Sequence, residues 1–372
     1  MNVLIIGGGV IGLAAARELR LAGAGRVTVL EKGQAGREAS WAAAGMLAPD
    51  AETETVDAMY RLCRRSNELY PEFAERLADE TGIDIELDRT GTICVALSDE
   101  DLEHLGGRMA AQQTAGINAA LLSSTDIARL EPSLSLDVVG GMLYPDNGQV
   151  ENRKLVAALL EFARRNSIEV HENSPVDELE IRNGKAVGVS VKGKSLEADA
   201  IVIAAGAWQS ELLDKADVRC PRVTPVKGQV IAFERVSSLR HVVYGAGGYL
   251  VPRRDGRLLV GATVEDAGFN TDVTADGVLS LRQSAERLLP GLAGREPDDK
   301  WAGLRPFAAG GDPIIGAVPG VSGLFVAAGH YRNGILLAPV TAQLIAEAVL
   351  KGSVPDLGRQ FLPASGKEAA AS

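Results

Sequence analysis

Short runs of consecutive apolar residues recur at three distant places in the chain, and each run leads into glycine. The runs are residues 3–6 before Gly7, 201–205 before Gly206, and 324–328 before Gly329. An uninterrupted apolar run of this length is typical of a strand that is buried on both faces. The pattern therefore predicts one sheet whose strands come from the beginning, the middle and the end of the chain.

Between these runs, apolar residues recur at helical or at alternating spacing. Helical spacing predicts helices at 13–21, 55–81, 153–166, 274–289 and 334–351. Alternation predicts strands at 26–30, 85–87 and 92–97, and the pattern over 99–131 indicates helix, strand, helix. Residues 168–203 and 221–265 are strand-rich, and Asn183-Gly184 is a hairpin signal within the first of these segments.

The segments between the three runs are long enough to form a second domain. We therefore predict an α/β (mixed α+β) fold in which a Rossmann-like domain and a substrate domain are both discontinuous. The first is expected to comprise residues 1–82, 146–220 and 302–365, and the second residues 83–145 and 221–301. Residues 366–372, rich in alanine and serine, are expected to form a flexible tail.

The first run opens a dinucleotide-binding motif. Gly7, Gly9 and Gly12 have the spacing G-x-G-x-x-G, and a helix and a second strand ending in Glu31 follow. The glycines permit a tight turn, close approach to a pyrophosphate and close packing of helix on strand. Glu31 is placed to accept hydrogen bonds from a ribose diol, and its charge argues against a 2′-phosphate. The alternative is a structural glycine-rich turn in another α/β protein.

Composition narrows the classes of function. The chain has 372 residues and a net charge of −11, without a basic run, so we expect no nucleic-acid partner. We see no apolar stretch of the ~18–20 residues that would span a membrane, and expect no membrane partner. Cys63, Cys94 and Cys220 are odd in number and far apart, which favours reduced thiols in a cytoplasm. The four histidines have no metal-ligand spacing, so no metal is expected.

Three residues outside the glycine motif are candidates for substrate binding. Arg305 lies between apolar residues and turn formers, and a guanidinium there could bind a carboxylate through two parallel hydrogen bonds. Tyr249 and Arg332 could add a hydroxyl and a second positive charge. Two of them have a structural alternative: Tyr249 as a packed aromatic and Arg305 as half of a buried ion pair. His330 is equally open, as a packed histidine or as a neighbour of a flavin.

No motif for a nucleophile is present: we find neither G-x-S-x-G, nor a P-loop, nor a cysteine beside a histidine. Oxidation of an amine by a flavin needs no protein nucleophile, because positioning of the Cα–H bond supplies most of the rate. The last apolar run also leads through 329–336 into a helix, whose N-terminus would stabilise negative charge on a reduced flavin.

The motifs together resemble the glycine oxidases within the D-amino-acid oxidase family of FAD-dependent enzymes. The resemblance covers essentially the whole chain in order, and its segments are 7–12 with Glu31, 39–47 (ASWAAAGML), 248–252 (GYLVP), 261–263 (GAT), 301–306 (WAGLRP) and 329–339 (GHYRNGILLAP). It implies an FAD domain with a mixed sheet and a substrate domain built on a large antiparallel sheet that covers the isoalloxazine. No cysteine lies in the flavin segments, which implies FAD bound non-covalently.

The resemblance also implies roles for individual residues. Arg305 matches the arginine that binds the substrate carboxylate, Tyr249 the tyrosine that donates to it, and Arg332 a second carboxylate contact. The implied FAD contacts, together with the glycine motif, are Gly7, Gly9, Val10, Ile11, Gly12, Glu31, Lys32, Ala39, Ser40, Ala44, Gly45, Met46, Val176, Gly206, His330, Tyr331, Arg332, Asn333, Gly334, Ile335 and Leu336. Val264 and Trp41 depart from the family pattern and are expected to alter the preferred substrate size.

The implied reaction is oxidation of glycine, sarcosine or small D-amino acids by hydride transfer to flavin N5. The products are an imine, which hydrolyses to a 2-oxo acid and ammonia, and H2O2 from O2. The implied role is supply of the thiazole branch of thiamine biosynthesis by a cytoplasmic homo-oligomer, a dimer or a tetramer. Two alternatives stay open: a D-amino-acid dehydrogenase with a quinone or carrier acceptor, and a non-catalytic flavoprotein subunit.

Overall fold

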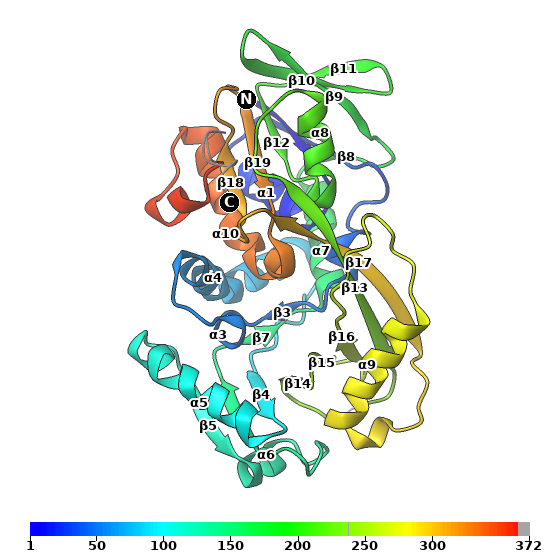
Figure 1. Ribbon diagram of the computed structural model, residues 1–372. Helices are drawn as coiled ribbons and strands as arrows, with labels where there is room; N and C mark the ends of the chain where they lie inside the picture. The colour runs from blue at the N-terminus through cyan, green and yellow to red at the C-terminus, as the bar shows by residue number, and fades with distance from the viewer. Residues whose placement is uncertain (237, 364–372) are drawn as a thin grey trace.

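The computed structural model describes residues 1–236 and 238–363. Its first sheet has six strands in the described part of the chain and occupies the upper half of Figure 1. All neighbours in it pair in parallel except β18 and β19, which are antiparallel. The strand order is β18 (Ile314–Ala317), β19 (Leu324–Ala328), β12 (Ala200–Ile203), β1 (Asn2–Ile6), β2 (Arg26–Leu30) and β8 (Glu169–His171).

The second sheet has eight described strands and lies in the lower half of Figure 1. It is antiparallel except where β14 and β4 pair in parallel. Its order is β17 (Asp299–Ala308), β13 (Val223–Phe233), β16 (Leu258–Gly261), β15 (Gly248–Pro252), β14 (Val242–Gly245), β4 (Thr92–Ala96), β6 (Gly140–Tyr144) and β5 (Ala120–Ser123). The long strands β13 and β17 extend from this sheet toward the six-stranded sheet.

Two smaller sheets complete the described strands. One is the meander β9 (Val176–Arg182), β10 (Lys185–Val191) and β11 (Lys194–Glu197), and the other pairs β3 (Met46–Leu47) with β7 (Gly148–Gln149). The Asn183-Gly184 turn between β9 and β10 has φ values of +50° and +72°. Positive φ at both central residues is the geometry of a tight hairpin turn, so the hairpin signal is confirmed.

Ten α-helices and four short 3-10 helices lie in the described residues. The α-helices are α1 (Val10–Leu21), α2 (Ala39–Ala42), α3 (Pro49–Glu52), α4 (Ala58–Thr81), α5 (Asp99–Thr114), α6 (Ser124–Leu130), α7 (Asn152–Arg165), α8 (Gln209–Lys215), α9 (Ala275–Leu288) and α10 (Gly334–Lys351). The 3-10 helices are η1 (Gly206–Trp208), η2 (Pro290–Leu292), η3 (Tyr331–Asn333) and η4 (Asp356–Phe361).

Alternating residues of β1 place the six-stranded sheet between two apolar layers. Val3 and Ile5 face a core formed with α1, α4, α7 and α10. Leu4 and Ile6 face a second core formed with α8 and the meander. Both faces of the strand are therefore buried, which explains its continuous apolar run.

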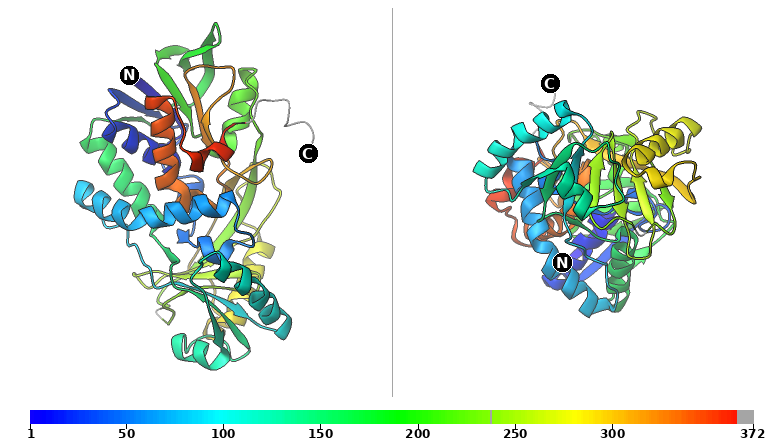
Figure 2. Two further views of the ribbon diagram at one scale, coloured as in Figure 1. Left: turned by 90° about the vertical axis from the view of Figure 1, so that its left-hand side faces the viewer. Right: turned by 90° about the horizontal axis from the view of Figure 1, so that it is seen from below.

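The eight-stranded sheet also has two different faces. Val243 and Leu250 belong to a core closed by α6 and α9, whereas their neighbours Tyr244 and Tyr249 face the α2 segment and Trp301. Helix α5 packs on the same side as Tyr244. Seen from below in Figure 2, α5 and α9 accordingly lie on different sides of this sheet. The face that carries the two tyrosines is turned toward the first sheet.

Most predicted elements are confirmed, with three differences. Residues 85–87 are not a strand, because Glu86 has φ +56°, in the left-handed region, and Ile85 is buried in the helical core instead. The predicted domain boundary between 301 and 302 falls inside β17, which belongs as a whole to the large sheet. Residues 364–372, with the predicted tail, lie outside the described residues.

The third difference concerns α10. Residues Tyr331–Lys351 are long enough to cross a bilayer and contain an 18-residue window with a mean hydropathy of 1.5, contrary to our expectation that no such stretch exists. However, 72% of this window is buried inside the protein, where α10 packs on α1 and α4. The pattern is that of a core helix, which is hydrophobic all round because it is buried all round.

Candidate active site

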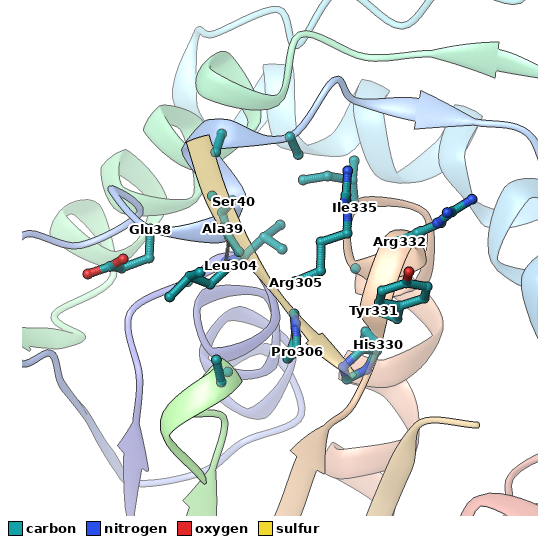
Figure 3. A pocket seen from close by; sticks show the side chains of 18 of the residues that line it. Glu38, Ala39, Ser40, Leu304, Arg305, Pro306, His330, Tyr331, Arg332 and Ile335 are labelled. Atoms are coloured by element: carbon teal, nitrogen blue, oxygen red, sulfur yellow. Dashed lines mark hydrogen bonds between the residues drawn. The ribbon is translucent and has the colours of Figure 1, made fainter. Parts of the chain in front are cut away.

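A cavity of about 950 Å³ is lined by residues of both sheets and of the loops between them. One end is formed by the first strands and helix of the six-stranded sheet, and the other by β13–β17 and the loop before α10. In Figure 3, Arg305 projects from β17, and His330, Tyr331 and Arg332 come from the loop before α10. A concave site of this size suits a large ligand such as a dinucleotide.

The glycine motif shapes the first end of the cavity. Gly7 has φ +111°, and a Cβ on it would lie 2.2 Å from the carbonyl oxygen of Ala204. A Cβ on Gly12 would lie 2.0 Å from the Gly7 oxygen, so this glycine permits the close packing of α1 on the turn. Gly9 is the N-cap of α1 and contributes no side chain, which leaves the helix N-terminus open to an anion.

Glu31 is held rigidly beside this turn. Its two carboxylate oxygens accept hydrogen bonds from the backbone N–H groups of Gly8, at 2.8 Å, and Gly33, at 2.9 Å. The residue is buried, yet it lines the cavity together with Lys32, whose ammonium lies 3.0 Å from the centre of the Trp208 ring. The carboxylate keeps lone pairs for a ribose diol, because each oxygen can accept two hydrogen bonds.

The residues present fit FAD. The glycine turn has no side chains where a Cβ would otherwise stand, so its backbone can approach a pyrophosphate. Small side chains in α2 and in the segment after it leave room along the cavity. A Cβ on Gly9 would lie 3.2 Å from Ser40 Oγ, and that oxygen accepts a 2.9 Å hydrogen bond from the backbone N–H of Val10. The cavity then continues from the glycine turn to the large sheet, as the length of FAD requires.

Nearly all the sequence-predicted cofactor residues are brought together in this cavity. Its lining includes Gly7, Gly9, Val10, Ile11, Glu31, Lys32, Ala39, Ser40, Ala44, Gly45, Met46, Val176, Gly206, His330, Tyr331, Arg332, Asn333, Gly334 and Ile335. Two predicted contacts do not line it. Gly12 packs against the Gly7 carbonyl, and the Leu336 side chain points into the core below α10, where 1% of it is exposed.

Arg305 enters the second end of the cavity from β17. Its Nη1 donates to the carbonyl oxygens of Thr263, at 3.0 Å, and Lys227, at 3.4 Å. The guanidinium lies over the backbone of Gly228, where a Cβ would be 2.3 Å from Nη2. Within the described residues Arg305 forms no ion pair, and its Nη1 bonds to backbone carbonyl oxygens instead, so the buried-ion-pair alternative is not supported. The two backbone carbonyl oxygens therefore orient the Arg305 side chain independently of any ligand.

Tyr249 lies beside it on β15 and is also seated over a glycine. A Cβ on Gly261, its partner in β16, would lie 2.4 Å from the phenol oxygen. Burial raises the pKa of Tyr249, against the lowering effect of Arg305. The phenol of Tyr249 is therefore protonated at neutral pH and has a hydrogen available for donation. The packed-aromatic alternative is also partly met, because the Tyr244 and Tyr249 rings lie 5.9 Å apart.

The loop before α10 contributes one charged and one neutral group. Arg332 is exposed and lines the cavity, 5.3 Å from the Tyr331 ring centre. His330 is 2% exposed, and its Nε2 lies 3.0 Å from Thr341 Oγ1. Burial lowers the pKa of His330 to about 3, so the imidazole is neutral. His330 therefore combines both sequence interpretations, since it is packed in the core and also borders the cavity.

Several polar residues that line the cavity have no counterpart in the sequence predictions, and four of them lie on α3, β14 and α5. Glu52 ends the short helix α3, Tyr244 lies on β14, and His104 and Arg108 come from α5. The Tyr244 hydroxyl donates a hydrogen bond to Glu52 Oε1. The only signal available in the sequence was the proximity of Glu52 to the 39–47 segment, which is too weak to identify a role.

The two departures from the family pattern lie in different places. Val264 lines the cavity and is 57% exposed. Trp41 does not line it, because its ring packs edge-on against Trp301, with centroids 5.6 Å apart, and stacks under the Arg153 guanidinium at 3.7 Å. Only Val264 is thus placed to affect substrate size directly.

The described residues contain no cluster of three or more acidic, cysteine or histidine side chains that could hold a metal. All three cysteines are described and are free thiols, two of them buried. Burial raises the pKa of Cys94 and Cys220 to about 12, so neither is a thiolate at neutral pH.

Comparison with known proteins identifies the cofactor and the class of enzyme. The chain is 39% identical to the glycine oxidase of Pseudomonas aeruginosa over 360 residues, which are 95% of this chain and 96% of the relative. It is also 39% identical to the bifunctional protein ThiO/ThiG of Synechocystis, of which it spans 53%. The crystal structure of glycine oxidase from Geobacillus kaustophilus superposes with a TM-score of 0.92 at 36% identity, covering 98% of both chains.

These relatives confirm the resemblance inferred from the motifs, and with it the expected fold class. The cofactor is FAD, and the protein is an oxidoreductase. Residues 2–348 match the family profile DAO, described as FAD dependent oxidoreductase, and the chain belongs to this family.

Proposed function

We propose that this protein is an oxidase of glycine and of other small amines such as sarcosine and D-amino acids. The observation that carries the proposal is the guanidinium of Arg305, held over Gly228 beside the phenol of Tyr249 at the end of a cavity that fits FAD. A non-catalytic flavoprotein would need neither side chain. Two of the three relatives named above are glycine oxidases by name, so the dehydrogenase alternative is not favoured.

In this proposal Arg305 binds the substrate carboxylate. The contacts of Nη1 with two carbonyl oxygens fix the plane of the guanidinium, so a carboxylate is received in one orientation. Tyr249 donates its O–H to the same carboxylate, and Arg332 adds positive charge at the exposed side of the cavity. Holding the acid end in this way directs the α-carbon along the cavity, and orientation of this kind supplies much of the rate.

FAD, when bound, supplies the hydride acceptor and, with O2 as oxidant, the source of H2O2. The protein contributes position and charge. The helix N-terminus that follows Asn333 faces the cavity and favours negative charge there. The neutral His330 adds no positive charge nearby and remains a packing residue. The oxidised amine product hydrolyses in water to a 2-oxo acid and ammonia.

The wider role follows from the same relatives. We propose that the product imine supplies the thiazole branch of thiamine biosynthesis, which is supported by the similarity to ThiO/ThiG of Synechocystis. We also propose a homo-oligomer, a dimer or a tetramer, located in the cytoplasm. The free thiols of Cys63, Cys94 and Cys220 support a reducing compartment.

The test is an absorption spectrum of the purified protein before and after anaerobic addition of glycine. We expect flavin bands that bleach with glycine and that return, with release of H2O2, when O2 is admitted. Acetate, which has the carboxylate but no amine, should leave the flavin oxidised. A spectrum that glycine, sarcosine and D-alanine all leave unchanged would reject the proposed reaction.

A further inference from the structure

Glu52 places a negative charge in a cavity end that is otherwise positive. Its half-buried side chain lines the cavity and accepts a hydrogen bond from the Tyr244 hydroxyl. It lies within electrostatic range of both Arg332 and Arg305. The binding of an amino-acid carboxylate by the two arginines does not require this carboxylate, so its presence needs another explanation.

The main chain around Glu52 is held from helix α5. Arg108 Nη2 donates to the carbonyl oxygens of Ala51, at 3.1 Å, and Thr53, at 2.6 Å, on either side of Glu52. Gln112 Nε2 donates to the Thr53 carbonyl oxygen as well, at 3.3 Å. These contacts fix the direction in which the short helix α3 ends. The hydrogen bonds from Arg108 and Gln112 therefore orient the Glu52 carboxylate toward the cavity.

The positive and negative side chains at this end of the cavity match the charges of a zwitterionic amino acid. An amino acid bound through its carboxylate at Arg305 presents an ammonium group about one bond from the α-carbon, and that ammonium needs an anion. Among the described residues that line this end of the cavity, Glu52 is the carboxylate next to the two tyrosines. An ammonium that loses its hydration on entering a cavity of this kind is stabilised only if it is paired.

We propose that Glu52 binds the amino end of the substrate and accepts one of its protons, with Tyr244 as the positioning residue. This rests on the proposed function of the site. In the step, one N–H bond of the ammonium breaks and its electron pair stays on nitrogen, while an O–H bond forms on Glu52. The resulting neutral amine has the lone pair that loss of hydride from the α-carbon requires.

The surroundings support such a role. Burial raises the pKa of the Glu52 carboxyl above its ordinary value, while the Tyr244 hydrogen bond, Arg332 and Arg305 lower it. A carboxylate that holds a proton more readily than an exposed one is the better acceptor. The titratable and charged groups around it, from each neighbouring element, are Cys63 (α4), Cys94 (β4), His104 and Arg108 (α5), Tyr244 (β14), Tyr249 (β15), Arg305 (β17) and Arg332 (η3).

The test compares Glu52→Gln with the wild-type holoenzyme. Gln keeps an oxygen for the Tyr244 hydroxyl but cannot take the proton. We expect the anaerobic rate of flavin reduction by glycine at pH 7 to fall by about 100-fold or more, with the deficit shrinking as pH rises. The Kd of acetate, read from the flavin spectrum, should stay within about threefold or tighten, because a nearby negative charge is removed. Glu54→Gln, on the exposed side of the same segment, is the matched control and should match wild type.

A parallel change for glycine and acetate, or a pH profile that superposes on wild type, would overturn the inference. If Glu52→Gln fails to bind flavin, the variant Tyr244→Phe tests the role of Glu52 instead. Loss of the hydroxyl removes a hydrogen bond that lowers the pKa of Glu52, so the acid limb of the reduction rate should move to higher pH. An unmoved limb rejects the role. Bleaching of the wild type by glycine is independent of these outcomes and tests the proposed function separately.

Discussion

The two ends of the cavity are built by opposite means. At the nucleotide end the ligand-facing groups are mostly backbone, because the turn at Gly7 and the start of α1 present main-chain N–H groups. At the substrate end they are side chains, namely Arg305 on β17, Tyr249 on β15 and Glu52 at the end of α3. One end is a local motif, whereas the other exists only after the sheets have assembled.

Glycine serves both ends, but in different ways. Gly7 is required by its own main chain, since its φ is +111° and the Ala204 carbonyl approaches it closely. Gly228 and Gly261 are required by a neighbour, because each makes room for a functional side chain lying across a strand. The same residue type therefore supplies a backbone contact in one region and an empty space in the other. Substitutions at the two kinds of glycine should therefore have different effects, on the backbone at Gly7 and on the neighbouring side chain at Gly228 and Gly261.

The largest effect is expected for Gly7→Ala. A methyl group there would collide with a backbone oxygen, and the left-handed φ alone costs about 1–3 kcal/mol for a residue other than glycine. We expect the purified variant to retain little flavin and to melt at lower temperature, measured by the ratio of flavin to protein absorbance and by thermal denaturation. Gly23→Ala is the matched control, since Gly23 has φ +92° but no atom within 4 Å of the added methyl. Equal flavin loss in both variants would contradict the role of the close approach.

Arg305→Ala should affect the substrate end of the cavity and leave the nucleotide end unchanged. We expect a normal flavin spectrum together with a loss of about 2–5 kcal/mol of substrate interaction, because a desolvated carboxylate would lose its partner. This corresponds to roughly a 30-fold to 5,000-fold decrease in kcat/KM for glycine. Steady-state oxygen consumption and flavin content measured on the same preparation provide the check. Unchanged kinetics would reject Arg305 as the carboxylate-binding residue.

The contrast between the ends also explains what the sequence could predict. The glycine motif and Glu31 were identified because a nucleotide-binding turn depends on residues close together in the chain. Arg305, Tyr249 and Arg332 were identified from short segments with a strong resemblance to a family, and the structure places all three at the cavity. Leu336 was predicted from the same motif but does not line the cavity, because membership of a motif does not tell which side of a helix a residue faces.

Glu52 was missed for a related reason. Neither its charge nor its spacing distinguishes it from Glu54, two residues later and exposed. What sets it apart is Tyr244, which reaches it from another part of the chain, and Arg108, which fixes its backbone from α5. Residues 85–87 show the converse, because alternation predicted a strand where the left-handed φ of Glu86 turns the chain instead. Long-range contacts decided both cases, and no local pattern records them.

The smallest of these effects, and the sharpest test of the comparison, is expected for Gly228→Ala. The added methyl would lie 2.3 Å from Nη2 of Arg305, so the guanidinium must move while the charge remains in the cavity. A displacement of about 1 Å in a binding group can cost up to ~100-fold in rate, and we expect a decrease in kcat/KM of about 10- to 100-fold, below the limit set by Arg305→Ala.

Flavin content should be unchanged in this variant, unlike in Gly7→Ala, because the methyl group meets the movable end of a side chain rather than a backbone oxygen. Gly291→Ala, with open space around the added methyl, controls for the loss of glycine itself. The double variant Gly228→Ala with Arg305→Ala then tests whether Gly228 acts through the space that it leaves for the Arg305 guanidinium. If the glycine acts only by making room for the guanidinium, the double variant should be no worse than Arg305→Ala alone, because residues that share one contact are not additive.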